Sequence, residues 1–312
     1  MNKNKIKNFV KDNNMYFLLL AFIIIGASIS DHFFTINNFI NLLQRSSVIG
    51  LISLGMTFVI IGAGIDLSVG SIVAVSGIVV ATLMTNGFNM VLAILITLLM
   101  TTLLGLLVGF ITVKFNLPSF IVSLAMMVSA RGLALLISGG SPVFGLSGVF
   151  AFIGGGRIGI LPFSVVIWLS VTAISAFILK YTAFGRKLYA LGGNEEAAFY
   201  SGIQTKYYKA ITFGISGLLA GSAGIVLASW LTVAQPSAGQ GLELDAIAAV
   251  VLGGTDLFGG SGGVIGTTIG VLILAIITNV FNLLGVASYY QYIFQGLIIV
   301  FALILNRLVV ND

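Results

Sequence analysis

The stretch MVLAILITLLMTTLLGLLVGFITV, residues 90–113, contains no charged side chain. About 20 consecutive apolar residues in a helix cross the hydrocarbon core of a bilayer, so this stretch predicts a transmembrane helix. Similar runs recur at about 15–35, 47–64, 68–86, 118–138, 162–183, 208–232, 243–258, 261–284 and 287–306. The sequence therefore predicts an all-α polytopic membrane protein with about ten transmembrane helices.

The composition supports this class along the whole chain. Of the 312 residues, 58% are hydrophobic and 7% are charged, and the mean hydropathy is +1.15. A soluble domain is about 25% charged, so this chain could not cover a surface that faces water. The 39 glycines favour close helix packing in lipid. The run 243–258 is short and glycine-rich, which suits either a full span or a half-helix of re-entrant type.

The basic residues indicate how the chain is oriented. The segment MNKNKIKNFVKDNN, residues 1–14, carries four lysines before the first apolar run, and no cleavage site of the signal-peptide kind follows it. With residues 1–14 inside, most other lysines and arginines also fall inside, as the positive-inside rule requires. We expect residues 1–14 and 185–206 to be cytoplasmic in a protein of the bacterial inner membrane. The net charge of +5 is explained by this bias, and no nucleic-acid partner is expected.

An internal similarity links two distant segments. GAGIDLSVGSI, residues 62–72, and LGGTDLFGGSG, residues 252–262, share five identical positions in eleven, including Asp66 and Asp256. In the count of ten spans both segments follow a helix that runs inward, which is a parallel relation. A duplication and a coincidence between glycine-rich segments both remain open. We treat residues 1–312 as a single domain that contains this candidate repeat.

Several kinds of chemistry lack their motifs. There is no G-x-x-x-x-G-K-[ST] phosphate loop, so the chain itself is not expected to bind ATP. His32 is the single histidine and there is no cysteine, so no metal site and no thiol chemistry are expected. No nucleophile–base or paired-carboxylate pattern stands out, and we expect no catalytic residue and no cofactor.

Ionisable residues within or near the apolar runs are costly in lipid and should face protein or water. They are Arg45, Asp66, Arg131, Glu243, Asp245 and Asp256. They suit a substrate or proton path, but Asp beside glycine also suits the cap of a broken helix. Asp66 is kept as a candidate for the translocation path.

The last hairpin, ITNVFNLLGVASYYQYIFQG, is rich in amides and tyrosines. Asn279, Asn282 and Gln291 are further candidates for the path, with Tyr289, Tyr290 and Gln295 nearby. Such uncharged groups suit a neutral polyhydroxy solute. Hydrogen bonding between helices is the alternative use of the same side chains.

The polar window LGGNEEAAFYSGIQTKYYKA, residues 191–210, predicts a short helix outside the bilayer. Asn194 suits the N-cap, Glu195 and Glu196 the first turn, and Gly202 the C-terminal end. Small Ala197 and Ala198 suit docking in a groove of a partner protein. A helix that lies on the membrane is the alternative, although anionic lipid would repel the two glutamates.

Three longer motifs carry a resemblance over nearly the whole chain. GMTFVIIGAGIDLSVGSI, GRKLYALGGNEEAAFYSGI and AQPSAGQGLELDAIAAVVLGGTDLFGG resemble the permease subunits of bacterial ABC importers for monosaccharides. The similarity runs from FFTINNFINLLQ to NLLGVASYYQ. The ribose permeases come first, and those for xylose, arabinose, galactosides and autoinducer-2 look similar, so these sugars stay open as alternatives. Ser237 and Gln240 lie in the AQPSAGQG motif, where relatives vary.

The resemblance implies a set of partners and a role for the polar window. It implies a second permease copy in a homodimer, a cytoplasmic ATP-binding subunit, an extracytoplasmic sugar-binding protein and a monosaccharide substrate. By similarity, the coupling loop that receives the motion of the ATPase contains Gly193, Asn194, Glu195, Glu196, Ala197, Ala198 and Gly202. A stand-alone secondary transporter is a weaker alternative because no chain of titratable groups crosses the membrane. A membrane enzyme has no supporting motif.

Overall fold

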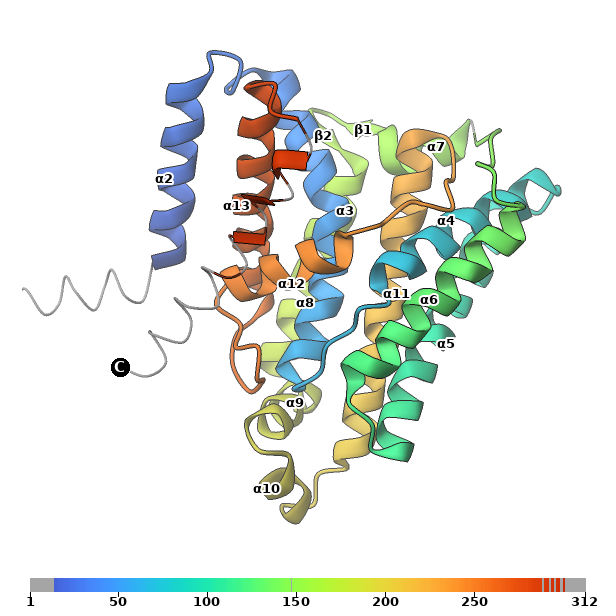
Figure 1. The fold of residues 1–312 in the computed structure, drawn as a ribbon, viewed down its shortest axis with the longest axis vertical. Helices are drawn as coiled ribbons and strands as arrows, with labels where there is room; N and C mark the ends of the chain where they lie inside the picture. The colour runs from blue at the N-terminus through green and yellow to red at the C-terminus, as the bar shows by residue number, and fades with distance from the viewer. Residues whose placement is uncertain are drawn as a thin grey trace, which may run out of the picture.

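The computed structural model describes residues 14–300 except 147, 288, 292, 295, 298 and 299, and this part is almost entirely helical (Figure 1). Its elements are α2 (Asn14–Ile29), α3 (Ile36–Ile61), α4 (Val69–Thr85), α5 (Met90–Phe115), α6 (Ser119–Ser138), α7 (Val149–Gly155), β1 (Arg157–Ile158), β2 (Leu161–Pro162), α8 (Phe163–Tyr181), α9 (Ala183–Gly193), α10 (Glu195–Tyr200), α11 (Thr205–Leu231), α12 (Leu242–Leu252) and α13 (Val264–Leu283). The two short strands pair antiparallel. The predicted all-α polytopic class is confirmed.

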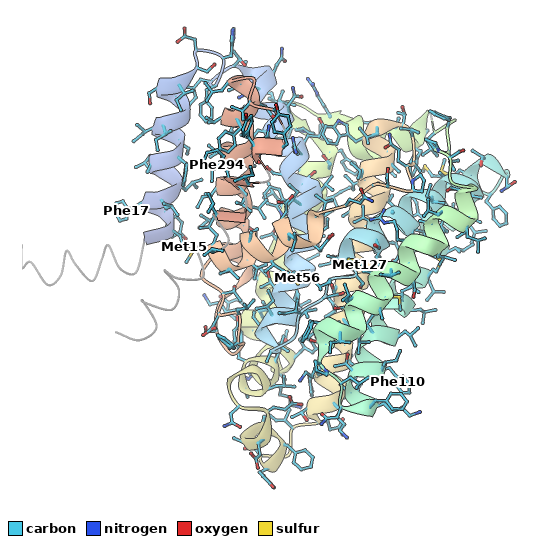
Figure 2. All side chains as sticks on the ribbon, in the orientation of Figure 1. Met15, Phe17, Met56, Phe110, Met127 and Phe294 are labelled. Atoms are coloured by element: carbon cyan, nitrogen blue, oxygen red, sulfur yellow. The ribbon has the colours of Figure 1, made fainter. Side chains whose placement is uncertain are left out.

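Helix α3 forms the centre of the bundle. Met56 and Phe58 of α3 are almost fully buried, and α3 packs against α8, α11, α12 and α13. The outer helices instead point large apolar side chains away from the bundle: Phe110 of α5 and Phe17 of α2 project outward in Figure 2. Such a surface would be insoluble in water but is matched to lipid.

Helices α5 and α11 make the most extensive helix–helix contact in the described part of the chain. Small residues of α5 recur at every fourth position along the buried stripe, at Thr97, Thr101, Gly105 and Gly109. A Cβ added to Gly217 of α11 would lie 3.1 Å from the Cα of Gly105, so the two backbones touch. This small-residue packing is the way in which helices associate without a hydrophobic driving force in lipid.

The expected ten spans divide differently in the structure. Six helices of the described residues are long and apolar enough to cross a bilayer, namely α3, α5, α6, α8, α11 and α13, and α2 and α4 are shorter apolar helices. α12 has 11 residues and rises about 16 Å, roughly half of the hydrocarbon thickness. The run 243–258 is therefore a half-helix. Most of the last expected span, 287–306, lies outside the described residues, as does the segment 1–13.

The expected second span, 47–64, begins too late. α3 starts at Ile36, because the Thr35 hydroxyl accepts a hydrogen bond from the Asn38 N–H at 3.4 Å and caps the helix. The polar residues between 37 and 45 lower the hydropathy of its first turns, which hid them from the search for apolar runs.

One end of the bundle collects basic residues. α5 and α8 finish there, α11 begins there, and α9 and α10 protrude from it at the bottom of Figure 1. These elements bring Lys114, Lys180, Arg186, Lys187, Lys206 and Lys209 to what we call the basic end. This is the distribution that the positive-inside rule predicts for a cytoplasmic face. The sidedness itself stays a prediction.

Candidate coupling and translocation sites

The polar window forms the helix α10 at the basic end. The side chain of Asn194 accepts a hydrogen bond from the Ala197 N–H at 2.8 Å and caps the helix as predicted. At the other end, Gly202 has φ +81°, and the next residue, Ile203, donates its N–H to the Ala198 carbonyl at 3.1 Å. The predicted start and end of this helix are thus confirmed.

The two alanines of α10 face in different directions. Ala198 is 4% exposed and packs against its own chain, whereas Ala197 is exposed. Ala198 was expected to be a position where a partner docks, and its burial makes it unavailable. The outward face instead carries Phe199 and Tyr200, which are 62% and 78% exposed. Exposed aromatic residues on a helix outside the bundle suit a contact with another protein, and the docking role of α10 stays a prediction.

Polar contacts hold α9 and α10 on the bundle. Glu195 forms an ion pair with Lys209 of α11 at 2.7 Å. The Tyr189 hydroxyl donates a hydrogen bond to the Gly262 carbonyl at 2.8 Å. Burial raises the pKa of Tyr189 above its usual value, which already lies well above neutral pH, so the phenol remains a hydrogen-bond donor. Gly193, Glu196 and Gly202 are exposed and make no such tie in the described residues.

Three backbones meet where α9 ends. The Gly260 N–H donates to the carbonyl of Ile61, the last residue of α3, at 3.0 Å. A Cβ on Gly192 would collide with that same carbonyl oxygen, and a Cβ on Gly260 would lie 2.7 Å from the Cα of Gly193. We call Gly192, Gly193, Gly260 and Ile61 the glycine junction. No side chain separates the backbones, so α9 is in direct contact with the end of α3.

The chain is non-helical between α3 and α4, and this link is buried against α6 and α11. The Ser119 and Ser123 hydroxyls accept hydrogen bonds from the N–H groups of Ile65 and Leu67, each at 3.0 Å. The fully buried Asp66 accepts from the Ser68 N–H at 3.0 Å and from the Ser216 hydroxyl at 2.8 Å. The structure therefore places Asp66 in a bracing role between the link and α11, and its role in the path stays a prediction.

The two segments of the candidate repeat lie side by side at the basic end. In each, the aspartate accepts a hydrogen bond from the backbone N–H two residues later, Ser68 for Asp66 and Phe258 for Asp256 (2.9 Å). The backbone bond of the glycine junction ties the second segment to Ile61, the residue before the first segment, and a Cβ on Gly259 would lie 2.9 Å from the backbone nitrogen of Ala63. Their turn geometry is alike, and the duplication remains a prediction.

A second non-helical segment, 232–241, precedes the half-helix α12. Arg131 of α6 donates from one guanidinium nitrogen to the carbonyls of Pro236 and Ala238, at 2.6 and 2.7 Å. Gly239, at φ +75°, touches the backbone of Gly70 at the start of α4. The segment 232–241 therefore meets the first turn of α4, just after the first break, and α6 is hydrogen-bonded to both non-helical segments. Non-helical backbone at membrane depth is tolerated where protein surrounds it or where it lines a cavity.

The three candidates of the last hairpin are hydrogen-bonded within the chain. Asn279 of α13 and Asn38 of α3 exchange amide hydrogen bonds at 2.7 and 3.0 Å. Asn282 accepts from the Gln291 amide at 3.0 Å. These contacts match the alternative reading of interhelical bonding. Gln295 lies outside the described residues.

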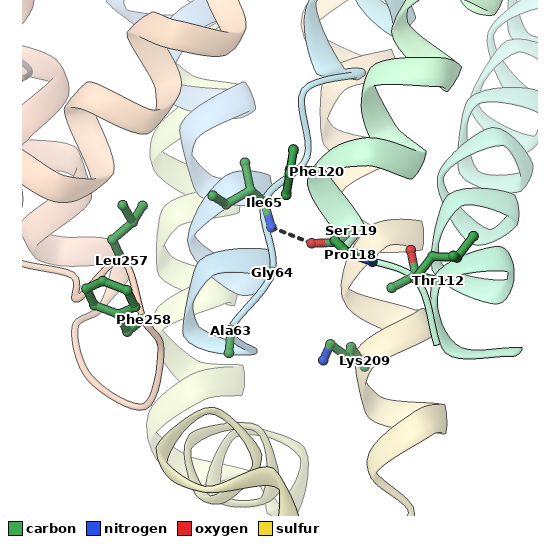
Figure 3. A pocket seen from close by; sticks show the side chains of 11 residues that line it. Ala63, Gly64, Ile65, Thr112, Pro118, Ser119, Phe120, Lys209, Leu257 and Phe258 are labelled. Carbon is green, nitrogen blue, oxygen red and sulfur yellow. Dashed lines mark hydrogen bonds between the residues drawn. The ribbon is translucent and has the colours of Figure 1, made fainter. Parts of the chain in front are cut away.

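Two cavities lie beside the two breaks, one at each. One, of about 370 Å³, lies at the basic end between Ser119 and Phe258 (Figure 3). The other, of about 250 Å³, is lined by Arg131 and by the polar side chains of Gln235, Ser237 and Gln240. Ser119 and Arg131 are about 18 Å apart along α6.

None of the residues that line the second cavity is one of the four path candidates, Asp66, Asn279, Asn282 and Gln291. A lone arginine within an apolar run and a polar motif, AQPSAGQG, were both visible in the sequence. What the sequence could not show is that the guanidinium of α6 binds the backbone of that motif from more than 100 residues away.

This arrangement of lipid-facing helices, two non-helical breaks inside the bundle and a capped helix at the basic end defines a polytopic membrane protein. The chain belongs to the family described as "Branched-chain amino acid transport system / permease component", whose model matches residues 38–303. It is thus a transport subunit and a multi-pass protein of the bacterial inner membrane.

Curated relatives cover almost the whole chain. The ribose import permease protein RbsC of Haemophilus influenzae is 42% identical over 98% of this chain and 98% of its own length. RbsC of Bacillus subtilis is 43% identical over 93% of this chain and 90% of its own length. The D-allose transport system permease protein AlsC of Escherichia coli is 41% identical over 94% and 91%. No solved structure matches the chain.

Proposed function

We propose that this chain is the transmembrane subunit of an ATP-driven importer and that its substrate is a monosaccharide, ribose in the first place. The observation that carries the proposal is the identity of 42–43% to ribose import permeases over more than nine tenths of the chain. The uncharged polar groups that line the cavity beside Arg131 support a neutral solute.

ATP hydrolysis is assigned to a separate cytoplasmic subunit that docks on α10. The exposed pair Phe199 and Tyr200 supplies the contact surface, and the glycine junction supplies the path from α10 to α3. Two copies of the chain form the translocation route between them, and a sugar-binding protein delivers substrate on the side opposite the basic end. ATP biases the two states of the dimer only through its different affinity for each of them.

Another sugar of the same family is the second candidate. The relative that carries the name of a D-allose permease is 41% identical, which is nearly as similar as the ribose permeases. Overall identity therefore does not separate the two sugars.

Reconstitution with the cognate ATP-binding subunit and binding protein tests the proposal. We expect ATP-dependent uptake of ribose into proteoliposomes, competed by unlabelled ribose, and no uptake when the ATP-binding subunit is left out. Ribose uptake by the chain alone, driven by a proton gradient, would instead establish a secondary transporter. Uptake of allose but not ribose would assign the second sugar.

A further inference from the structure

The cavity of about 250 Å³ beside Arg131 has a built frame. Its floor is α6, one wall is the segment that follows α6, and the other wall is the segment 232–241. The two walls are joined by backbone hydrogen bonds between Val143 and Ala234, at 2.9 and 3.0 Å. Arg131 fixes the second wall further through the carbonyls of Pro236 and Ala238. Groups that must recognise a ligand bind best when their backbone is held in this way.

Three polar side chains on this frame have no hydrogen-bond partner among the described residues. They are Gln235, Ser237 and Gln240, all exposed and all lining the cavity. They lie on the same short segment as Pro236 and Ala238, the two residues whose carbonyls accept hydrogen bonds from Arg131. Their amides and hydroxyl offer both donors and acceptors, the combination that a sugar hydroxyl requires.

The charges around the cavity are balanced. The Arg131 guanidinium is engaged by backbone carbonyls, and Glu243 lies beside Gly70, where it interacts electrostatically with Arg131. A charged solute would therefore find no free counter-charge here. The volume lies below the range of about 300–1,000 Å³ that is typical of drug-sized ligands, so the cavity suits a single sugar ring.

We propose that this cavity is a monosaccharide subsite of the permease itself, in which Gln235, Ser237 and Gln240 bind sugar hydroxyls and discriminate between sugars during translocation. The inference rests on the proposed function. It adds a second step of sugar selection within the membrane subunit, after the binding protein has selected the sugar that it delivers.

The test compares ribose and allose uptake by the reconstituted importer, together with the ATPase rate stimulated by loaded binding protein. Gln235→Ala and Gln240→Ala each remove one hydrogen-bonding group from the lining of the cavity. We expect either to change the ratio of ribose to allose uptake about two- to tenfold, the effect of one lost neutral hydrogen bond, with the stimulated ATPase rate preserved. Ser237→Trp should fill the cavity and stop uptake of both sugars while ATPase stimulation continues.

Asn37→Ala is the matched control, because Asn37 is an exposed amide on α3, away from the cavity. It should leave both the ratio and the rates unchanged. The subsite is refuted if both glutamine variants keep the wild-type ratio, or if uptake and ATPase stimulation fall together, as a contact with the binding protein would produce. If the wild-type importer moves neither sugar, the proposed function fails and not the subsite alone.

Discussion

At the scale of single residues, the glycines near the end of α9 show how position decides the role of a residue type. Gly192 and Gly193 are neighbours in one helix. A Cβ on Gly192 would collide with the Ile61 carbonyl, whereas a Cβ on Gly193 would meet nothing within 4 Å. The sequence pattern GG cannot distinguish them, because the difference lies in the backbone of α3, about 130 residues earlier.

This contrast gives a prediction for the glycine junction. Gly192→Ala should destabilise the chain by about 1–3 kcal/mol through overpacking and should lower sugar uptake per ATP hydrolysed. Gly193→Ala should be neutral or stabilising by up to about 1 kcal/mol, since alanine favours the helix over glycine. Thermal unfolding in detergent and the ratio of uptake to hydrolysis measure the two effects. Equal behaviour of the two variants would mean that the junction does not transmit motion.

At the scale of elements, the amide pair Asn38–Asn279 joins α3 to α13. Substituting it tests whether Asn279 stabilises the bundle or takes part in transport. Asn38→Leu leaves the Asn279 amide without its partner, whereas after Asn279→Leu the Asn38 amide keeps only its bond to the Phe33 carbonyl at 2.9 Å. Such interhelical bonds are worth about 0.6–2 kcal/mol. We expect each single variant to unfold at lower temperature and the double variant to recover part of the loss.

Transport by the stable double variant then decides the role of Asn279. Wild-type uptake by Asn38→Leu/Asn279→Leu would establish the pair as a brace. Loss of uptake with stability restored would return Asn279 to the translocation path.

The exposed face of α10 gives a second prediction at this scale. Tyr200→Ala should weaken co-purification with the ATP-binding subunit about tenfold or more, because aromatic anchors dominate binding at interfaces. Val149→Ala, an equally exposed position on α7 at the other end of the bundle, is the control and should have no effect. If Tyr200→Ala binds the ATPase normally, α10 is not the docking element. Ala198→Trp would be a poor probe, since it would disturb the packing of α10 on its own chain.

At the scale of the whole molecule, the basic end predicts the orientation in the membrane. The chain has no cysteine, so single cysteines can be labelled without a background. Ile160→Cys, at a 74% exposed position near β2, should react with a membrane-impermeant thiol reagent in intact cells, and Glu196→Cys should react only after lysis. The reverse pattern would invert the topology.

The sequence predicted the class, most of the spans and the capped helix at the basic end, because apolar length and local capping are properties of short windows. It failed where contacts between distant parts of the chain determine helix bounds and cavities. The first turns of α3 are polar yet helical, and α12 stops at 11 residues although its apolar run is longer. The cavity beside Arg131 arises from a bond across more than 100 residues, which no local pattern contains.

The deep burial of α3 has a consequence for biosynthesis. α3 is the least apolar of the six long helices, with buried serines and threonines along its length, and its partner α11 begins at Thr205. At roughly 5–20 residues per second, the ribosome delivers α11 about 7–30 s after α3 has been made. During that interval the central helix of the finished protein lacks α11, and the neighbours α12 and α13 follow later still. We therefore expect newly made α3 to stay beside the insertion machinery, detectable by crosslinking, until α11 arrives.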